Sequence, residues 1–236
     1  MIKFIQLKQR FDVIKMQKEV CALESDLWKP HYNSKHYEGS WTTLQLRSIN
    51  GDIENSISIQ GSSLLGNMAY RNTILLEQCT YLQSVINFFE CEKMSVRLMN
   101  LHAGAVIKEH TDYEMNFEKG EARFHIPIQT NQGVSFFIED QKIPLNEGEC
   151  WYLNLSLKHR VNNFGNTNRI HLVIDCKVND WTKNLFNEEV ILTEMIDENY
   201  QINYNASDKI KIIQQLRLMG TPVSKELADK LEAESD

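Results

Sequence analysis

The length and composition of the chain suit one core domain with a small appendage. Its 236 residues are 42% hydrophobic and 24% charged, proportions at which a globular protein buries a substantial core. The formal net charge of −7 provides no basic footprint, so we expect no nucleic-acid partner.

The sequence also predicts a cytoplasmic protein without a membrane partner. No apolar run approaches the roughly 18 residues that a membrane span requires, and the first residues lack the long apolar stretch and cleavage site of a secretory signal. The five cysteines contain no CxxC pair, and their odd number indicates free thiols in a reducing compartment.

The N-terminal part is predicted to contain two helices with a strand between them. Apolar residues recur at helical spacing over residues 8–27, ending before Lys29-Pro30, and again over residues 75–90. Residues 41–46 contain the aromatic and β-branched side chains that favour a strand.

From residue 95 onward the hydrophobic period changes from that of a helix to that of a strand. Turn signals such as Asn131-Gln132-Gly133 and Asn146-Glu147-Gly148 separate the segments. Short strands at regular spacing, without intervening helices, are typical of an antiparallel barrel or a double-sheet jelly roll. The predicted strands are 95–101, 122–129, 134–139, 150–157 and 169–176.

After Trp181 the pattern becomes helical again. Residues 208–219 and 224–234 each have the spacing of a helix, and Gly220-Thr221-Pro222 joins them. We therefore expect a mainly β domain with N-terminal helices over residues 1–185 and a helical C-terminal extension over residues 186–236.

Three residues have the identity and spacing of metal ligands. His110 and Asp112 are two apart, so on a strand or its extension both side chains leave the same face. His159 follows a predicted strand. Two imidazoles and one carboxylate hold one face of a ferrous ion and leave its other positions open. Considered singly, His110 with Asp112 also fits a hydrogen-bonded pair in a surface loop, and His159 also fits a loop.

Charged residues on two predicted strands add to this set. Arg169 begins a very apolar strand, and a buried guanidinium needs a partner. That partner is either a bound dicarboxylate, held by the planar fork, or a carboxylate of the protein such as Asp175. Arg123 and His125 share one face of their strand. That face either lines a cavity or is exposed to solvent.

With these residues the chain resembles the aspartyl/asparaginyl β-hydroxylase family of Fe(II)- and 2-oxoglutarate-dependent dioxygenases, which includes free-proline hydroxylases. The resemblance covers roughly residues 10–180 and is most distinctive in its later motifs. The segments that carry it are 37–41, 46–48, 96–101, 104–107, 110–112, 123–127, 159–163 and 169–175.

The resemblance implies a double-stranded β-helix, the jelly roll of the cupins, that binds Fe(II) and the cosubstrate 2-oxoglutarate. By this resemblance His110, Asp112 and His159 would be the iron ligands. Arg169 would bind the distal carboxylate of 2-oxoglutarate, and His125 would help to hold that molecule. Because Asp112 occupies the position that a halogenase leaves vacant for chloride, a halogenase is disfavoured.

Two further residues are candidates for contact with the substrate. Arg123 would meet a substrate carboxylate or the cosubstrate. Trp41 would line the substrate entrance or, alternatively, pack inside the barrel. No role is assigned to His102 or His171.

The expected reaction is hydroxylation of an unactivated C–H bond with O2, releasing succinate and CO2. The substrate would be a small free amino acid such as proline, or an aspartyl or asparaginyl residue in a peptide. The sequence also leaves open a non-catalytic, metal-binding cupin-type sensor or small-molecule-binding module. Arg169 favours the enzyme, because a sensor has no need of a dicarboxylate clamp.

Overall fold

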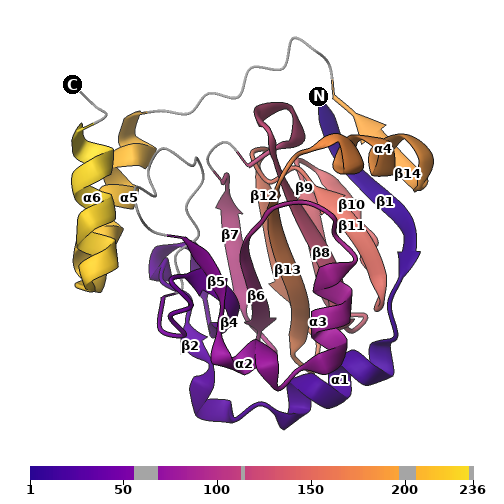
Figure 1. Cartoon of the computed structure of the whole chain (residues 1–236), viewed down its shortest axis with the longest axis horizontal. Helices are drawn as coiled ribbons and strands as arrows, with labels where there is room; N and C mark the ends of the chain where they lie inside the picture. Colours follow the sequence, from indigo (N-terminus) through magenta and orange to yellow (C-terminus); the bar gives the residue numbers. More distant parts are fainter. Residues whose placement is uncertain (56–68, 113–114, 197–205, 234–236) are drawn as a thin grey trace.

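Two facing β-sheets form the body of the molecule in the computed structural model, which describes residues 1–55, 69–112, 115–196 and 206–233. Helices α1 (Val13–Ala22) and α3 (Thr80–Asn87) lie against the outside of the larger sheet (Figure 1). Helices α5 (Ala206–Met219) and α6 (Pro222–Ala233) form a separate pair beside the sheets. One apolar cluster joins the helices to the larger sheet, and a second fills the space between the two sheets.

Eight consecutive strands give the jelly-roll connectivity. The larger sheet contains the order β11-β8-β13-β6, the smaller sheet contains β10-β9-β12-β7, and the pairs are antiparallel. This arrangement confirms the predicted double-stranded β-helix. The strands are β6 (Lys93–Leu101), β7 (Val106–His110), β8 (Glu121–Gln129), β9 (Val134–Ile138), β10 (Gln141–Ile143), β11 (Glu149–Leu153), β12 (His159–Asn163) and β13 (Arg169–Lys177).

Additional strands widen both sheets. The larger sheet continues through β1 and β14 at one side and through β4, β2 and β5 at the other, while β3 joins the smaller sheet at β7. Their bounds are β1 (Ile2–Arg10), β2 (Lys29–Pro30), β3 (Tyr37–Glu38), β4 (Trp41–Ile49), β5 (Tyr70–Asn72) and β14 (Val190–Met195). The strand predicted at residues 41–46 is confirmed and is longer than expected.

The first predicted helix is wrong at its start. Residues up to Arg10 form β1, which pairs with β11 and β14, and helix α1 covers only Val13–Ala22. Asp12 begins the helix, because its carboxylate accepts a hydrogen bond from the backbone N–H of Lys15. Residues 8–10, which the predicted helix included, therefore belong to strand β1.

The second predicted helix is two helices, α2 (Ile74–Glu77) and α3 (Thr80–Asn87). The carboxylate of Glu19, on α1, accepts hydrogen bonds from the backbone N–H groups of Tyr81 (2.7 Å) and Leu82 (2.9 Å). These bonds satisfy donors that the first turn of α3 leaves open. The cap comes from a distant part of the chain, which is why the local pattern did not reveal it. In the described part of the chain, the short 3-10 helices are η1 (Ser25–Leu27), η2 (Ser34–His36) and η4 (Phe117–Lys119).

The strands missed by the sequence prediction include β7 and β12, which hold few apolar residues. β7 contains Lys108-Glu109-His110 and β12 contains His159-Arg160, so neither has the apolar alternation of a half-buried strand. Their mutual pairing and the pairing of β12 with β9 place them in the sheet. The strand predicted at 150–157 ends at Leu153.

The C-terminal region contains α4 (Asp180–Glu188), β14, α5 (Ala206–Met219) and α6 (Pro222–Ala233). The predicted helix pair is therefore confirmed, and the stretch after residue 185 also contains strand β14, which pairs with β1 and was not predicted. Within the described ranges, no helix has the length and apolar character needed to cross a bilayer. The division into two parts at residue 185 stays a prediction.

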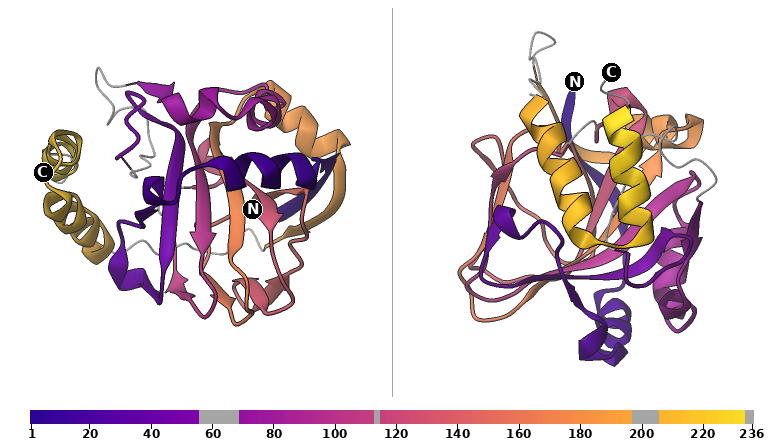
Figure 2. Two further views of the ribbon diagram at one scale, coloured as in Figure 1. Left: turned by 90° about the horizontal axis from the view of Figure 1, so that it is seen from below. Right: turned by 90° about the vertical axis from the view of Figure 1, so that its left-hand side faces the viewer.

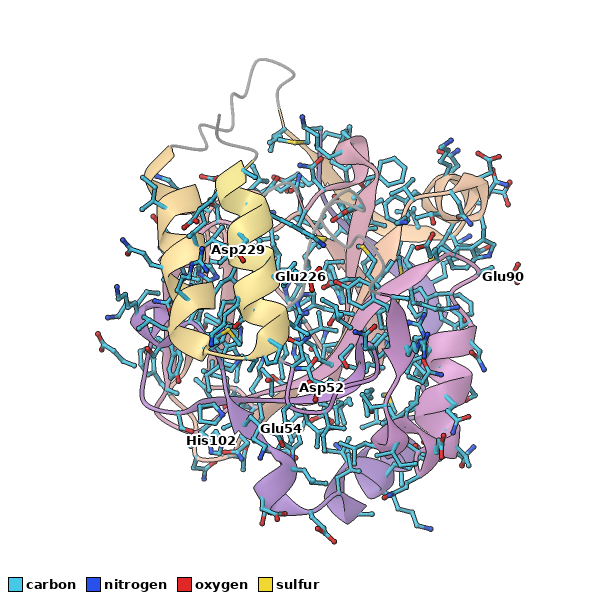
Figure 3. All side chains as sticks on the ribbon, turned by 60° about the vertical axis from the view of Figure 1, so that its left-hand side comes forward. Asp52, Glu54, Glu90, His102, Glu226 and Asp229 are labelled. Carbon is cyan, nitrogen blue, oxygen red and sulfur yellow. The ribbon has the colours of Figure 1, made fainter. Side chains whose placement is uncertain are left out.

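Helices α5 and α6 lie beside the edge of the larger sheet that contains β4 and β5 (Figure 2). Leu216, Leu227 and Ala228 form a small apolar cluster with Ile49 of β4. Arg217 on α5 also pairs with Asp229 and Glu232 on α6. Figure 3 labels Asp229 and Glu226, both of which belong to α6.

Candidate metal centre

The three predicted ligands lie together at one end of the smaller sheet. His110 ends β7 and His159 begins β12, where the two residues are direct partners in the register. Asp112 lies just beyond β7, where its backbone N–H donates to the carbonyl of Leu155 (2.8 Å). One ligand atom from each residue lies within 4.8 Å of the other two. The structure therefore brings together the set that the spacing predicted.

Backbone carbonyls orient both imidazoles. The Nδ1 atom of His110 lies 2.7 Å from the carbonyl oxygen of Lys108, and the Nδ1 atom of His159 lies 3.0 Å from that of Leu157. Because a carbonyl only accepts, these contacts assign the proton to Nδ1 and leave the lone pair on Nε2. Such an outer hydrogen bond is the usual way in which a protein holds a metal-binding imidazole.

Burial keeps His159 neutral. Burial, followed by repulsion from His110, lowers the pKa of His159 to about 3. A neutral imidazole is the form that binds a metal. The ring of His159 stacks with Phe136, at 6.4 Å between centroids.

The segment that precedes β4 lies beside the ligands. The ring of His36 is 4.9 Å from that of His110, and β3 pairs with β7. Gly39 permits this approach: its φ of +79° favours glycine, and a Cβ there would lie 2.9 Å from the Cβ of Ala105.

A network of paired charges adjoins Asp112. Arg123 contacts Asp175 through Nε (2.6 Å) and Nη2 (3.0 Å), and its Nη1 contacts Asp112. Arg97 also contacts Asp175, at 3.2 Å, and donates to Ser95. Arg123 and His125 are buried, so the alternative in which this face of β8 meets solvent is wrong. The predicted contact of Arg123 with substrate or cosubstrate stays a prediction.

The network controls the charge of Asp112. Burial alone would raise the pKa of the Asp112 carboxyl, but the Arg123 guanidinium and the two nearby histidines outweigh it and hold the pKa well below its usual range. Asp112 is therefore ionised at neutral pH, which is the form that a divalent metal requires.

Arg169 lies in a different environment. It is 2% exposed, and no carboxylate of the described residues pairs with it. Its Nη2 contacts the Nδ1 atom of His171 at 2.8 Å, and its Nε has no hydrogen-bond partner in the described structure. Burial lowers the pKa of Arg169 to about 9. The alternative partner Asp175 is excluded, because its carboxylate pairs with Arg97 and Arg123.

His125 and His171 complete this environment. Their Nδ1 atoms lie 3.4 Å apart, and the Nε2 atom of His125 is buried without a described partner. Burial, and then the charge of Arg169, lowers the pKa of both rings well below the ordinary histidine value. The buried Nε2 of His125 and Nε of Arg169 lack described hydrogen-bond partners. Together with the Arg169 guanidinium, they fit a ligand that carries two carboxylates.

His171 is a site residue to which the sequence gave no role. It lies two residues after Arg169 on β13, so both side chains leave the same face of the strand. This two-residue alternation along the strand was the sequence signal that could have identified His171 as a site residue. A guanidinium only donates, so the Nδ1 atom of His171 accepts in this contact and helps to hold the Arg169 side chain.

Trp41 packs inside the barrel. It is buried in the apolar cluster between the sheets, its ring stacks on His31 at 3.6 Å between centroids, and Tyr37 meets it edge-on. This placement agrees with the packing alternative. Its indole Nε1 is nevertheless buried without a described partner. His102, labelled in Figure 3, contacts Thr42 and Asn100 and does not join the site.

Comparison with known proteins settles the family. The model of the aspartyl/asparaginyl β-hydroxylase family matches residues 9–178. The chain belongs to this family. The prediction made from the motifs is therefore confirmed, and it groups the chain with enzymes named for hydroxylation.

A curated relative within reach of sequence comparison has low sequence identity to this chain. An L-proline cis-4-hydroxylase of Rhizobium meliloti (strain 1021) is 28% identical over 170 residues, which cover 71% of this chain and 58% of the relative. The chain thus matches somewhat more than half of that protein's length.

Two solved structures are also similar. A 2OG-Fe(II) oxygenase family oxidoreductase from Burkholderia pseudomallei has a TM-score of 0.46 and 12% identity, covering 71% of this chain and 79% of its own. The viral collagen prolyl hydroxylase of Paramecium Bursaria Chlorella virus-1 has a TM-score of 0.42 and 8% identity, with coverages of 74% and 96%. The fold assignment above rests on the strand order of this chain.

Proposed function

We propose that the protein is an Fe(II)- and 2-oxoglutarate-dependent dioxygenase that hydroxylates an unactivated C–H bond of an amino acid. The convergence of His110, Asp112 and His159 carries this proposal. Two imidazoles and one carboxylate with open positions are the ligand set of non-haem Fe(II) oxygenases.

In this proposal the chain supplies orientation and the bound groups supply the oxidation. Iron would be held by Nε2 of both histidines and by the Asp112 carboxylate. When bound, iron and 2-oxoglutarate couple the use of O2 to decarboxylation, giving succinate, CO2 and a hydroxylated product. Arg169 would pair with the distal carboxylate of 2-oxoglutarate and fix its position, with His125 beside it.

The remaining residues would prepare the site. Arg123 would keep Asp112 ionised and directed at the metal, since its guanidinium contacts both Asp112 and Asp175. Leu101, Phe136, Val161 and Leu153 belong to the apolar cluster between the sheets and would exclude water from the reacting groups.

The substrate is proposed to be a free amino acid, with proline as the first candidate. The relative from Rhizobium meliloti is named for L-proline, and the family is named for aspartyl and asparaginyl hydroxylation. A residue within a peptide is therefore the second candidate. Both classes belong in the same assay.

The test is succinate formation from 2-oxoglutarate by the Fe(II)-loaded protein, with free amino acids and Asp- or Asn-containing peptides added in turn. We expect succinate to rise with one compound and to be lost in His110→Ala. His102→Ala is the matched control, because His102 lies outside the site, and it should retain activity. If 2-oxoglutarate does not bind the iron-loaded protein, the proposal fails and a metal-binding sensor replaces it.

A further inference from the structure

The inner face of the larger sheet holds buried polar atoms that lack partners in the described structure. They are Trp41 Nε1, Gln45 Oε1, His125 Nε2 and Arg169 Nε. The proposed cosubstrate accounts for the atoms of His125 and Arg169. Gln45 is 2% exposed, and neither the metal centre nor the cosubstrate end explains its oxygen.

The strand register places Gln45 in line with the site. Gln45 on β4 is directly opposite Arg97 on β6, Arg97 is opposite Val173 on β13, and Val173 is opposite His125 on β8. Directly opposed residues share one face of a sheet. Gln45 is thus three strand spacings from His125, roughly 14 Å along the sheet, on the side of the interior away from the proposed cosubstrate end.

The described surroundings of Gln45 do not satisfy its oxygen. Its Nε2 donates to Thr43 Oγ1 at 3.3 Å, so the oxygen is the end of the amide that lacks a partner. Arg97 directs Nη1 to Ser95 and Nη2 to Asp175. A buried carbonyl without a donor is costly, so the arrangement fits a ligand that brings its own N–H.

Aromatic rings of the segment before β4 pack against Trp41, the first residue of that strand. The ring of Tyr32 lies 4.6 Å from that of His31 between centroids, tilted by 32°, and His31 stacks on Trp41. Burial, and next the charge of Asp112, raises the pKa of the Tyr32 phenol, while Arg97 opposes that change. The Tyr32 side chain therefore lies among the charged groups of the site, near the row that contains Gln45.

We propose that Gln45 is a specificity-determining residue whose side-chain oxygen accepts a hydrogen bond from the amino group of the substrate. The substrate class that it selects is an α-amino acid with a free N–H, as opposed to the carboxylic acid of the same shape that lacks nitrogen. This inference rests on the proposed function in placing a substrate beside the cosubstrate, and it adds the residue that recognises the amine.

The experiment measures binding and turnover of matched ligand pairs. L-Proline is compared with cyclopentanecarboxylate, and L-leucine with 4-methylpentanoate, by calorimetric titration of the anaerobic Fe(II)- and 2-oxoglutarate-loaded protein. We expect the wild type to prefer the amino acid of at least one pair. In Gln45→Met, which keeps the length of the side chain and removes the acceptor, that preference should fall about 10- to 100-fold. Affinity for the nitrogen-free acid and for 2-oxoglutarate should be unchanged.

Asn100→Leu is the matched control. Asn100 also has a buried amide oxygen without a described partner, but it is one residue out of phase with Leu101 and Met99, so it faces the other side of the sheet. It should leave the preference intact. Gln45→Glu, unlike Gln45→Met, keeps an acceptor oxygen at this position and should therefore keep the preference of the wild type.

The outcomes separate this inference from the proposed function. If wild type and Gln45→Met discriminate equally, or if the wild type shows no preference in either pair, the role of Gln45 is overturned. Succinate formation with the nitrogen-free acids would then still support the dioxygenase. Conversely, a Gln45-dependent preference without succinate would support the subsite and count against the reaction.

Discussion

Two groups of buried arginines share the inner face of the larger sheet and differ in how their charges are balanced. Arg97 and Arg123 both pair with Asp175, and Arg123 also pairs with Asp112. Arg169, equally buried, contacts only His171 and the ring face of Phe136 among the described residues. The fold itself neutralises Arg97 and Arg123, whereas Arg169 has no counter-charge among the residues that the structure describes.

This difference separates structural charge from charge kept for a ligand. A buried ion pair has exchanged its water for internal partners, so removing one partner leaves an uncompensated charge. An unpaired buried guanidinium has lost its water without that exchange, and its lowered pKa reflects the loss. Binding a dicarboxylate would supply the missing partner. The comparison therefore predicts opposite responses to substitution in the two groups.

The largest effect is expected at Asp175. The Asp175→Asn variant removes the negative charge shared by Arg97 and Arg123, and the free energy of unfolding should fall by about 3–5 kcal/mol. Urea unfolding of the metal-free protein, followed by circular dichroism, measures the change. The control is Asp140→Asn, because Asp140 pairs with Arg160 at an exposed position and should change stability little. A comparably small loss at Asp175 would show that the buried network is not structural.

The opposite response is expected at Arg169. The Arg169→Met variant replaces an unpaired buried charge with an apolar side chain, so the stability of the ligand-free protein should be unchanged or higher. The wild type should gain about 2.7 kcal/mol from 2-oxoglutarate at a hundred times its Kd, and the variant should gain almost nothing at that concentration.

Iron binding distinguishes a cosubstrate clamp from a general role in the site. Titration of Arg169→Met with Fe(II) should give an affinity close to that of the wild type, because the three ligands lie elsewhere. Equal losses of iron and 2-oxoglutarate binding would contradict the assignment of Arg169. Destabilisation of the ligand-free variant would show instead that Arg169 belongs to the structural group.

The sequence predicted those features that depend on residue identity and hydrophobic period. His110, Asp112 and His159 were singled out by their identity and spacing, and the structure brings them together. The jelly roll was predicted from short strands at regular spacing and from the family resemblance. The choice of partner for Asp175 was not predictable, since it depends on register: Asp175 lies opposite Arg123 on β8, whereas Arg169 lies opposite Leu101 on β6. A shift of one residue in the register of β13 would have given Asp175 and Arg169 different partners on β8 and β6.

Long-range contacts account for the other differences. Glu19 caps α3 from another helix, and β7 and β12 are polar strands held by their pairing partners. His171 is different, because its alternation with Arg169 was visible in the sequence. Its side chain faces the same interior, but only the contact with Nη2 of Arg169 shows what it does.

The smallest expected effect is a pH dependence from His171 within the unpaired group. Burial, followed by the charge of Arg169, places its folded-state pKa well below the ordinary histidine value. The folded state therefore binds this proton less readily than the unfolded state, whose histidine pKa is about 6.5. Its stabilising contribution is present above that pH and is lost as the pH falls below it.

Substitution isolates that contribution from the other titrating groups. Below pH 6, the unfolding free energy of the metal-free wild type should fall more steeply than that of His171→Gln, by up to about 1.4 kcal/mol per pH unit. Between pH 7 and 8 the two curves should run parallel, which serves as the internal control. Glutamine can still accept a hydrogen bond from Arg169, so the difference reports the proton and not the lost contact. Parallel curves throughout the acid range would mean that His171 accepts its proton in the folded protein, and the group around Arg169 would then be more hydrated than its burial implies.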